Sequence, residues 1–160
     1  MTDCLADKPS VDLLHFAVHG SYDPNGIQDG IVLLDGTFLN PMDVRGAILP
    51  RHPFVFLNAC QVGQGNRILG DYGGMAEAFL FARSSAVIAP LWSIEDIVAK
   101  QIAIEFYQGN STKPAQYLRE ARARFTLGPV AQSATYLAYQ YFGHPELRLQ
   151  LPPVLPGDTV

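Results

Sequence analysis

Two continuous apolar runs, each ending on a reactive side chain, constrain the fold of this chain more than any other feature. The first run covers residues 13–18 and leads into His19 and Gly20, and the second covers residues 54–59 and leads into Cys60. Runs of this kind are typical of strands that are buried on both faces, as in parallel sheets. In open α/β sheets, functional groups gather beyond the carboxyl ends of such strands. His19 and Cys60 are therefore predicted to meet at one edge of a single sheet.

A cysteine beside a histidine is the smallest pair that supplies a thiolate nucleophile together with its base. A free thiol has a pKa of about 8.5 and is mostly protonated at neutral pH, whereas a nearby imidazole favours the thiolate. The alternative is that Cys60 packs as a small buried hydrophobe, as free cysteines often do. The pairing with His19 and the glycine-rich loop after Cys60 favour the nucleophile.

The composition is that of a folded domain of ordinary size. Of its 160 residues, 48% are hydrophobic and 16% are charged, so we expect one domain with a sizeable core. The net charge of −4 provides no basic face for nucleic acid. The two cysteines, Cys4 and Cys60, make no disulfide framework, which suits a reducing compartment. No apolar stretch is long enough to span a membrane and no signal-peptide pattern opens the chain, so the predicted location is the cytoplasm.

The remaining pattern predicts an α/β sheet with helical crossovers. Asp35 and Gly36 lie between two short apolar runs and predict a hairpin with a two-residue turn, in which both central positions need a positive φ. Asn40 and Pro41 are predicted to begin a short helix, as N-cap and first-turn proline. Further strands are expected at residues 86–91 and 135–142, and helices at residues 75–82, 94–107 and 114–125.

Five segments resemble, in order along the chain, the CHAT domain, a family of caspase- and separase-like cysteine peptidases often fused to TPR repeats. They are residues 14–20, 57–63, 78–80, 86–96 and 139–145. Motifs that occur in the right order are more specific than any one of them alone. The resemblance implies a caspase-like three-layer sandwich, in which a mostly parallel sheet has helices on both faces. The domain is expected at residues 11–151, with flexible ends at 1–10 and 152–160.

The resemblance also implies an activity, namely a cysteine endopeptidase that cleaves proteins through a Cys–His dyad and needs no cofactor or metal. His19 would be the general base and Cys60 the nucleophile, and the amides of Gly20 and Cys60 would form the oxyanion hole. A second histidine, His15, lies on the same face of the strand about 13 Å from His19, since each residue advances a strand by ~3.3 Å. We interpret His15 as a structural histidine held by a partner.

Three further residues are candidates for substrate binding. Trp92, Ser93 and Asp96 lie in the loop that borders the S1 pocket in caspase-like peptidases. Asp96 also has a structural interpretation, because Ser93 and Asp96 have the spacing of a capping box with Ser93 as N-cap. We favour the cap for Asp96, with a pocket role as the second possibility.

The resemblance implies partners as well. Domains of this family usually act as regulated effectors, so the expected partners are a protein substrate and an activator, with neither nucleic acid nor a membrane. Caspase-like folds place two more strand–helix units before the His-bearing strand, and these units are not found ahead of it here, so the domain is expected to be partial. The activator would be a TPR-containing or sensor protein, or the missing N-terminal part of the same protein. The alternative function is a non-catalytic CHAT-like interaction module.

Overall fold

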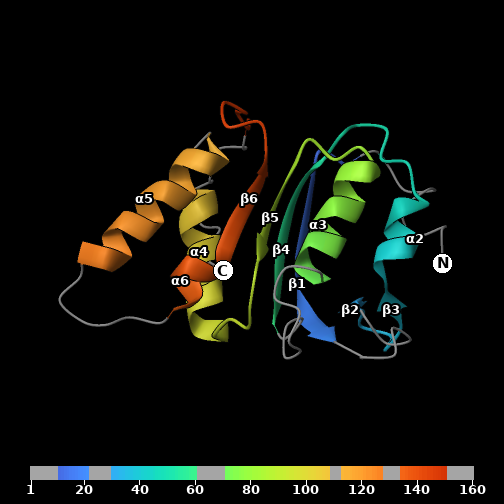
Figure 1. The fold of residues 1–160 in the computed structure, drawn as a ribbon, viewed down its shortest axis with the longest axis horizontal. Helices are drawn as coiled ribbons and strands as arrows, with labels where there is room; N and C mark the ends of the chain where they lie inside the picture. Colours follow the sequence, from blue (N-terminus) through green and yellow to red (C-terminus); the bar gives the residue numbers. More distant parts are fainter. Residues whose placement is uncertain (1–10, 22–29, 61–70, 109–112, 128–133, 151–160) are drawn as a thin grey trace, which may run out of the picture.

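The computed structural model describes residues 11–21, 30–60, 71–108, 113–127 and 134–150. The described backbone forms a six-stranded sheet in the order β3-β2-β1-β4-β5-β6, with helices on both of its faces (Figure 1). The predicted flexible ends and the glycine-rich loop at residues 61–70 lie outside the described residues.

The elements follow one another in nearly the predicted order. The strands are β1 (Leu13–Ser21), β2 (Gly30–Val32), β3 (Phe38–Leu39), β4 (Phe54–Cys60), β5 (Ala86–Pro90) and β6 (Tyr139–Gly143). The helices are α2 (Pro41–Arg45), α3 (Asp71–Phe81), α4 (Asp96–Gln108), α5 (Pro114–Leu127) and α6 (Thr135–Ala138). The α/β fold class is thereby confirmed.

The centre of the sheet is parallel and its flanks are antiparallel. The strand β4 pairs in parallel with β1 on one side and with β5 on the other, and the three remaining pairings, β1–β2, β2–β3 and β5–β6, are antiparallel. The predicted mostly parallel sheet is therefore confirmed only in part. A short hairpin adds β2 and β3 to one side, and β6 returns alongside β5 in the opposite direction, so neither flank is reached by a parallel crossover.

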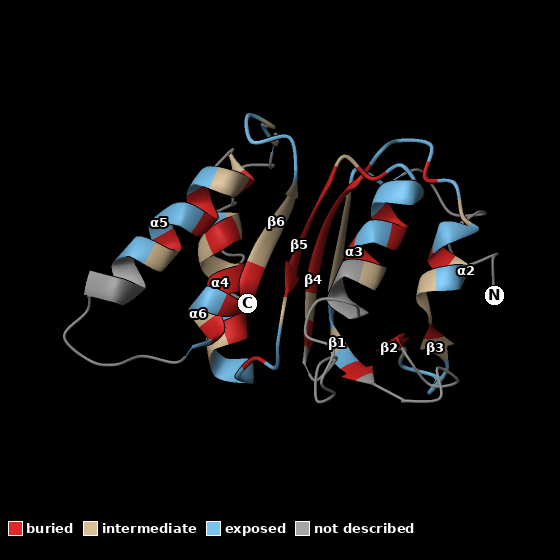
Figure 2. Ribbon diagram, viewed as in Figure 1, coloured by how far each residue is buried: buried red, intermediate tan, exposed pale blue. Residues whose placement is uncertain are grey.

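Side chains of the central strands alternate between two cores, one on each face of the sheet. On one face, Val55, Leu57 and Val87 pack with Met75 and Phe79 of α3. On the other face the sheet packs against α4 and α5 through a second buried cluster, which includes Phe54, Phe56, Ile88, Ile102, Phe106, Tyr117 and Leu118. Figure 2 shows the buried strands β4 and β5 between these helical layers. Helices therefore cover both faces of the sheet, and the implied caspase-like three-layer sandwich is confirmed in part.

The β2–β3 hairpin differs from the prediction in its turn. The carbonyl of Leu33 accepts a hydrogen bond from Gly36 N (2.9 Å), and Leu33 N donates to Thr37 O (2.8 Å). Gly36 has a φ of 78°, whereas Asp35 does not have a positive φ. The connection is a three-residue loop closed by a left-handed glycine, so the predicted two-residue turn was wrong. The Asp35 carboxylate instead accepts bonds from the backbone N–H and the hydroxyl of Thr37, at 3.0 and 2.6 Å.

The short helix after Asn40 is confirmed, together with its cap. Asn40 Oδ1 accepts a hydrogen bond from Asp43 N (2.9 Å), and Asp43 Oδ2 accepts one from Asn40 N (3.3 Å). This reciprocal arrangement is a capping box, and Pro41 occupies the first turn, where its missing N–H is not needed.

The last predicted strand, at residues 135–142, was wrong over its first half. Residues 135–138 form the helical turn α6, and the chain becomes extended only at Tyr139 (φ −70°, ψ 132°). Thr135 is buried, and its hydroxyl accepts a hydrogen bond from Glu95 N just before α4 (2.9 Å). This tertiary contact fits a helical turn, and it outweighs the β propensity of the aromatic residues.

Candidate active site

The structure brings the backbones of His19 and Cys60 together at one edge of the sheet. The two residues are register partners, and they form the last pair in the parallel ladder that starts at Leu13 and Phe54. Neighbouring strands are about 4.8 Å apart, so side chains of register partners on a shared face are within reach of each other. The side chain of Cys60 lies outside the described part of the structure, whereas that of His19 is described and exposed.

Positions 19 and 60 fall on the same face of the sheet, the one covered by α4. Four residues earlier in the same register, the rings of His15 and Phe56 stack with their centroids 5.1 Å apart. Successive residues of a strand point to opposite faces, so an advance of four residues returns to the same face. Ala17, which lies between the two histidines on this face, is also exposed. The described part of β1 therefore presents an accessible strip that ends at His19.

Gly20 is buried and pairs with Ile31 of β2. The backbone that follows His19 is thus held by the hairpin on the side away from β4. This contact fixes the position of one of the two residues whose amides the family resemblance assigns to an oxyanion hole.

His15 has the structural surroundings that the sequence predicts. Its Nδ1 shares a hydrogen bond of 2.8 Å with the hydroxyl of Tyr107, a residue of α4. Burial lowers the pKa of His15 and raises the pKa of Tyr107, so both groups are neutral near pH 7. Because the unfolded chain takes up a proton at His15 more readily than the folded chain, a fall in pH through the ordinary histidine range favours unfolding. His15 is a packing residue, separate from the chemistry of His19.

The loop after β5 places Trp92, Ser93 and Asp96 at the carboxyl edge of the sheet, where β1 and β4 also end. All three residues are exposed. The predicted capping box is wrong, because α4 begins only at Asp96 and the carbonyl of Glu95 accepts the hydrogen bond from Ala99 N (2.8 Å). Ser93 lies too far upstream to cap this helix. Its role and that of Asp96 in substrate binding stay predictions.

Asn58 is a polar residue close to this edge that the sequence pattern did not mark as functional. Its one sequence signal is that it interrupts an apolar run. Asn58 lies two residues before Cys60 and therefore shares its face of β4. Its Nδ2 donates a hydrogen bond to Ala99 O of α4 (3.1 Å), and its Oδ1 accepts one from the hydroxyl of Tyr139 on β6. The carboxamide thus joins the Cys-bearing strand to a helix and to another strand.

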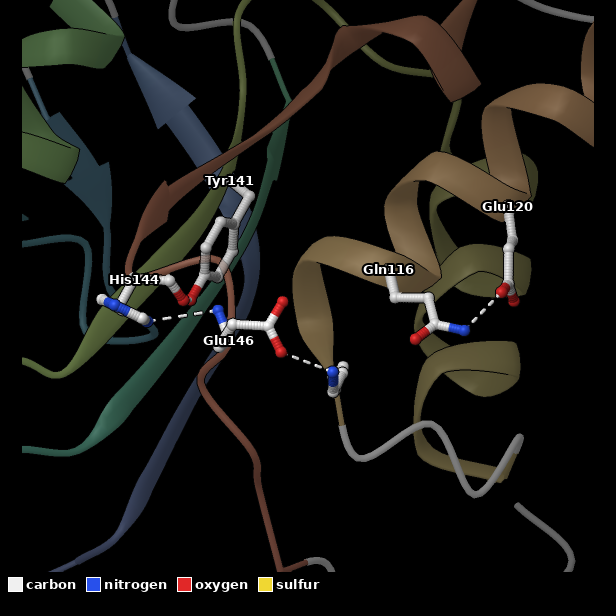
Figure 3. Close-up of polar contacts among 6 residues, drawn as sticks. Gln116, Glu120, Tyr141, His144 and Glu146 are labelled. Carbon is white, nitrogen blue, oxygen red and sulfur yellow. Dashed lines mark hydrogen bonds and ion pairs between the residues drawn. The ribbon is translucent and has the colours of Figure 1, made fainter.

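The motif at residues 139–145 ends at the opposite edge of the sheet. Gly143 is paired with Ala86, which lies beside Phe54 at the start of β4. Beyond it, Glu146 N donates to His144 Nδ1 (3.2 Å), and the Glu146 carboxylate bonds to Lys113 at the start of α5 (2.6 Å) (Figure 3). The hydrogen bond from Lys113 holds the pKa of the Glu146 carboxyl below its usual value. This end of the motif connects β6 to α5, away from His19.

The structure is an α/β domain in which a histidine and a cysteine lie at the ends of adjacent parallel strands. A family model of the CHAT domain matches residues 2–145. The chain therefore belongs to the CHAT family, which is related to the caspase-like cysteine peptidases. A comparison with curated proteins gives no match. Among the helices of the described residues, none combines the length and the apolar character that crossing a bilayer requires.

Proposed function

We propose that this chain is the catalytic portion of a cysteine endopeptidase of the CHAT family. The observation that supports the proposal best is the register pairing of His19 with Cys60 at the carboxyl ends of adjacent parallel strands. Two further observations agree with it. His19 is exposed, whereas His15, the other histidine of β1, is hydrogen-bonded to Tyr107.

The reaction uses four groups of the chain. His19 takes the thiol proton of Cys60, and the thiolate attacks the carbonyl carbon of the substrate peptide bond. The amides of Gly20 and Cys60 stabilise the oxyanion of the tetrahedral intermediate. When the intermediate collapses, the C–N bond breaks and the His19 imidazolium gives its proton to the leaving amine. Water then attacks the thioester with His19 as base, which releases the acid product and restores the thiol.

Substrate side chains would be read by the loop after β5. Trp92 is 37% exposed and offers an apolar surface, while Ser93 and Asp96 offer polar groups at the same edge. Trp92 and Ser93 lie in the short connection between β5 and α4, and Asp96 is the first residue of α4, so a peptide bound at His19 would meet all three together.

Differential alkylation tests this proposal directly. Below pH ~7.5, iodoacetamide should modify Cys60 faster than Cys4, because His19 sustains the Cys60 thiolate while an ordinary thiol stays protonated. The advantage should disappear in His19→Ala. His15→Gln is the matched control, since it removes an imidazole from the same strand and face but should keep the advantage. Mass spectrometry of the two cysteine peptides gives both rates. Equal rates in the wild-type chain would favour the non-catalytic interaction module.

We also propose that the domain is regulated through the edge of β1 that faces away from β4. Away from β4, only Gly20 and Ser21 of β1 have strand partners among the described residues. Phe16 and Val18 are only half-buried, whereas the side chains of β4 at Val55 and Leu57 are at most 2% exposed. Unpaired N–H and C=O groups of an edge recruit another strand. A TPR-containing or sensor protein, or an N-terminal part of the same protein, would supply that strand and support His19 from the open side.

The open edge predicts self-association of the isolated chain. Size-exclusion chromatography with light scattering should give a mass that rises with protein concentration, because a second copy can occupy the edge. Ala17→Lys adds an edge charge and should reduce the association. The same charge at Leu34, which is fully exposed on the β2–β3 hairpin, should not. A monomer that stays monomeric at all concentrations and cleaves peptides would show that β1 needs no further neighbour.

A further inference from the structure

The Cys-bearing strand loses one of its two strand neighbours before it reaches Cys60. Pairing of β4 with β5 ends at Phe56 and Ile88, although β4 itself continues for another four residues. If the ladder continued in the same register, Asn58 of β4 would lie opposite Pro90 of β5. A proline has no N–H to donate, so the ladder cannot continue normally at that row. Among the described strands, β1 alone has a backbone ladder with the last residues of β4.

The side chain of Asn58 makes bonds at the place where the ladder stops. Its Nδ2 donates to Ala99 O (3.1 Å), and its Oδ1 accepts from the hydroxyl of Tyr139. Tyr139 belongs to β6, on the other side of β5, where it is the register partner of Pro90. The Tyr139 side chain thus connects β6 to β4 at the position of Pro90, where the β4–β5 ladder has stopped. Through these two bonds β4 is tied to α4 and to β6 at the row nearest to Cys60 on this face.

Tyr139 is itself held firmly. It is fully buried, and its ring packs against Phe56 with the centroids 6.0 Å apart. Its backbone carbonyl accepts a hydrogen bond from Arg122 Nη2 of α5. Because these contacts fix Tyr139, its hydroxyl offers Asn58 a hydrogen-bond donor in a defined position.

We propose that Asn58 is a positioning residue that, with Tyr139 as its partner, holds the end of β4 so that Cys60 stays in register with His19. The proposal rests on the proposed function, since it gives Asn58 its effect through the Cys60 nucleophile. The carboxamide suits this place because it supplies one donor and one acceptor in fixed planar geometry. A carboxylate would set an oxygen against the Ala99 carbonyl, and an apolar side chain would leave the Tyr139 hydroxyl without this acceptor.

Tyr139→Phe is the sharpest variant, because it removes only the hydroxyl that bonds to Asn58. Tyr117→Phe is its matched control, since Tyr117 is also buried and donates from its hydroxyl to a carbonyl of α4, that of Ile102 (2.7 Å). Both variants lose one buried tyrosine hydroxyl bond. Only the first loosens the strand that carries Cys60.

The experiment measures iodoacetamide modification of Cys60 relative to Cys4 as a function of pH. In Tyr139→Phe and in Asn58→Asp, the advantage of Cys60 should fall by roughly tenfold or more, as small displacements of catalytic groups commonly do. The midpoint of its pH profile should move up toward the free-thiol value of about 8.5. The double variant Asn58→Ala/Tyr139→Phe should be no worse than Asn58→Ala, because the two residues act as one unit. Tyr117→Phe should keep both the rate and the profile of the wild type.

The outcomes separate this inference from the proposed function. If the wild-type chain shows the Cys60 advantage and Tyr139→Phe keeps it unchanged, the positioning role is overturned while the nucleophile stands. An equal loss in Tyr139→Phe and Tyr117→Phe would also overturn it, because a general loosening of the fold would then explain both. A wild-type chain without any Cys60 advantage would overturn the nucleophile and the positioning role together. Circular dichroism of each variant verifies that the rates come from folded protein.

Discussion

Cys60→Ala and His19→Ala should each abolish peptidase turnover, and the variant with both changes should be hardly slower than either single variant. The loss should reach roughly 10³-fold or more, since a nucleophile and its base act as one unit and neither works alone. Initial rates on a mixed peptide library, first profiled with the wild-type chain, provide the measurement. His19 is exposed, so its replacement should leave the melting temperature almost unchanged.

Cys4→Ala is the control for the dyad variants, because it removes the other thiol of the chain and should retain full activity. Cleavage by the Cys60→Ala chain of a substrate that the wild type cleaves would end the assignment of the nucleophile. A double variant far slower than both single variants would show that His19 and Cys60 contribute separately.

Gly143→Ala should lower the free energy of unfolding by roughly 2–4 kcal/mol, because it combines a steric clash with an unfavourable backbone conformation. Gly143 has a φ of 155°, and a Cβ built there would lie 2.5 Å from Ala86 Cβ and 2.9 Å from the hydroxyl oxygen of Tyr141. Both neighbours belong to the sheet. Ala86 is fully buried and paired with Gly143, so its Cβ cannot move aside. Urea denaturation followed by circular dichroism measures the change.

Gly46→Ala is the matched control for the Gly143 variant. Gly46 follows α2 with a φ of −75°, and the nearest atom to an added Cβ, a backbone carbonyl oxygen, would be 3.6 Å away. The change should be neutral or stabilising by up to about 1 kcal/mol, since alanine restricts the unfolded chain. Equal destabilisation by the two variants would mean that the close contact with Ala86 is not what requires a glycine at position 143.

The parts of the fold that the sequence predicted are those with a strong local signal. The continuous apolar runs at residues 13–18 and 54–59 predicted strands buried on both faces, as in a parallel sheet, and β1 and β4 do pair in parallel. The sequence predicted that His19 and Cys60 meet at one edge of the sheet, and the structure adds that they are register partners. The N-cap at Asn40 and the first-turn proline after it were equally local, and both are confirmed.

The parts that the sequence did not predict depend on contacts between distant residues. The partners of Asn58 lie 41 and 81 positions further along the chain, so no local pattern could reveal them. The helical turn at Thr135 depends on Glu95, which is 40 positions away. The turn of the hairpin was a different kind of error, because Asp35-Gly36 is compatible with two loop lengths and the pairing of Leu33 with Thr37 selects the longer one.

Trp92, in the loop between β5 and α4, is the single tryptophan of the chain. Intrinsic indole fluorescence of this protein therefore comes from one residue, and that residue stands at the edge where β1 and β4 end. With about a third of its surface in contact with solvent, at 37% exposure, the ring is open enough to respond to a molecule that settles on it. Its emission maximum and its quenching by iodide thus provide a label-free optical titration of that edge. The same signal would follow an inhibitor, a peptide or an activating partner in real time.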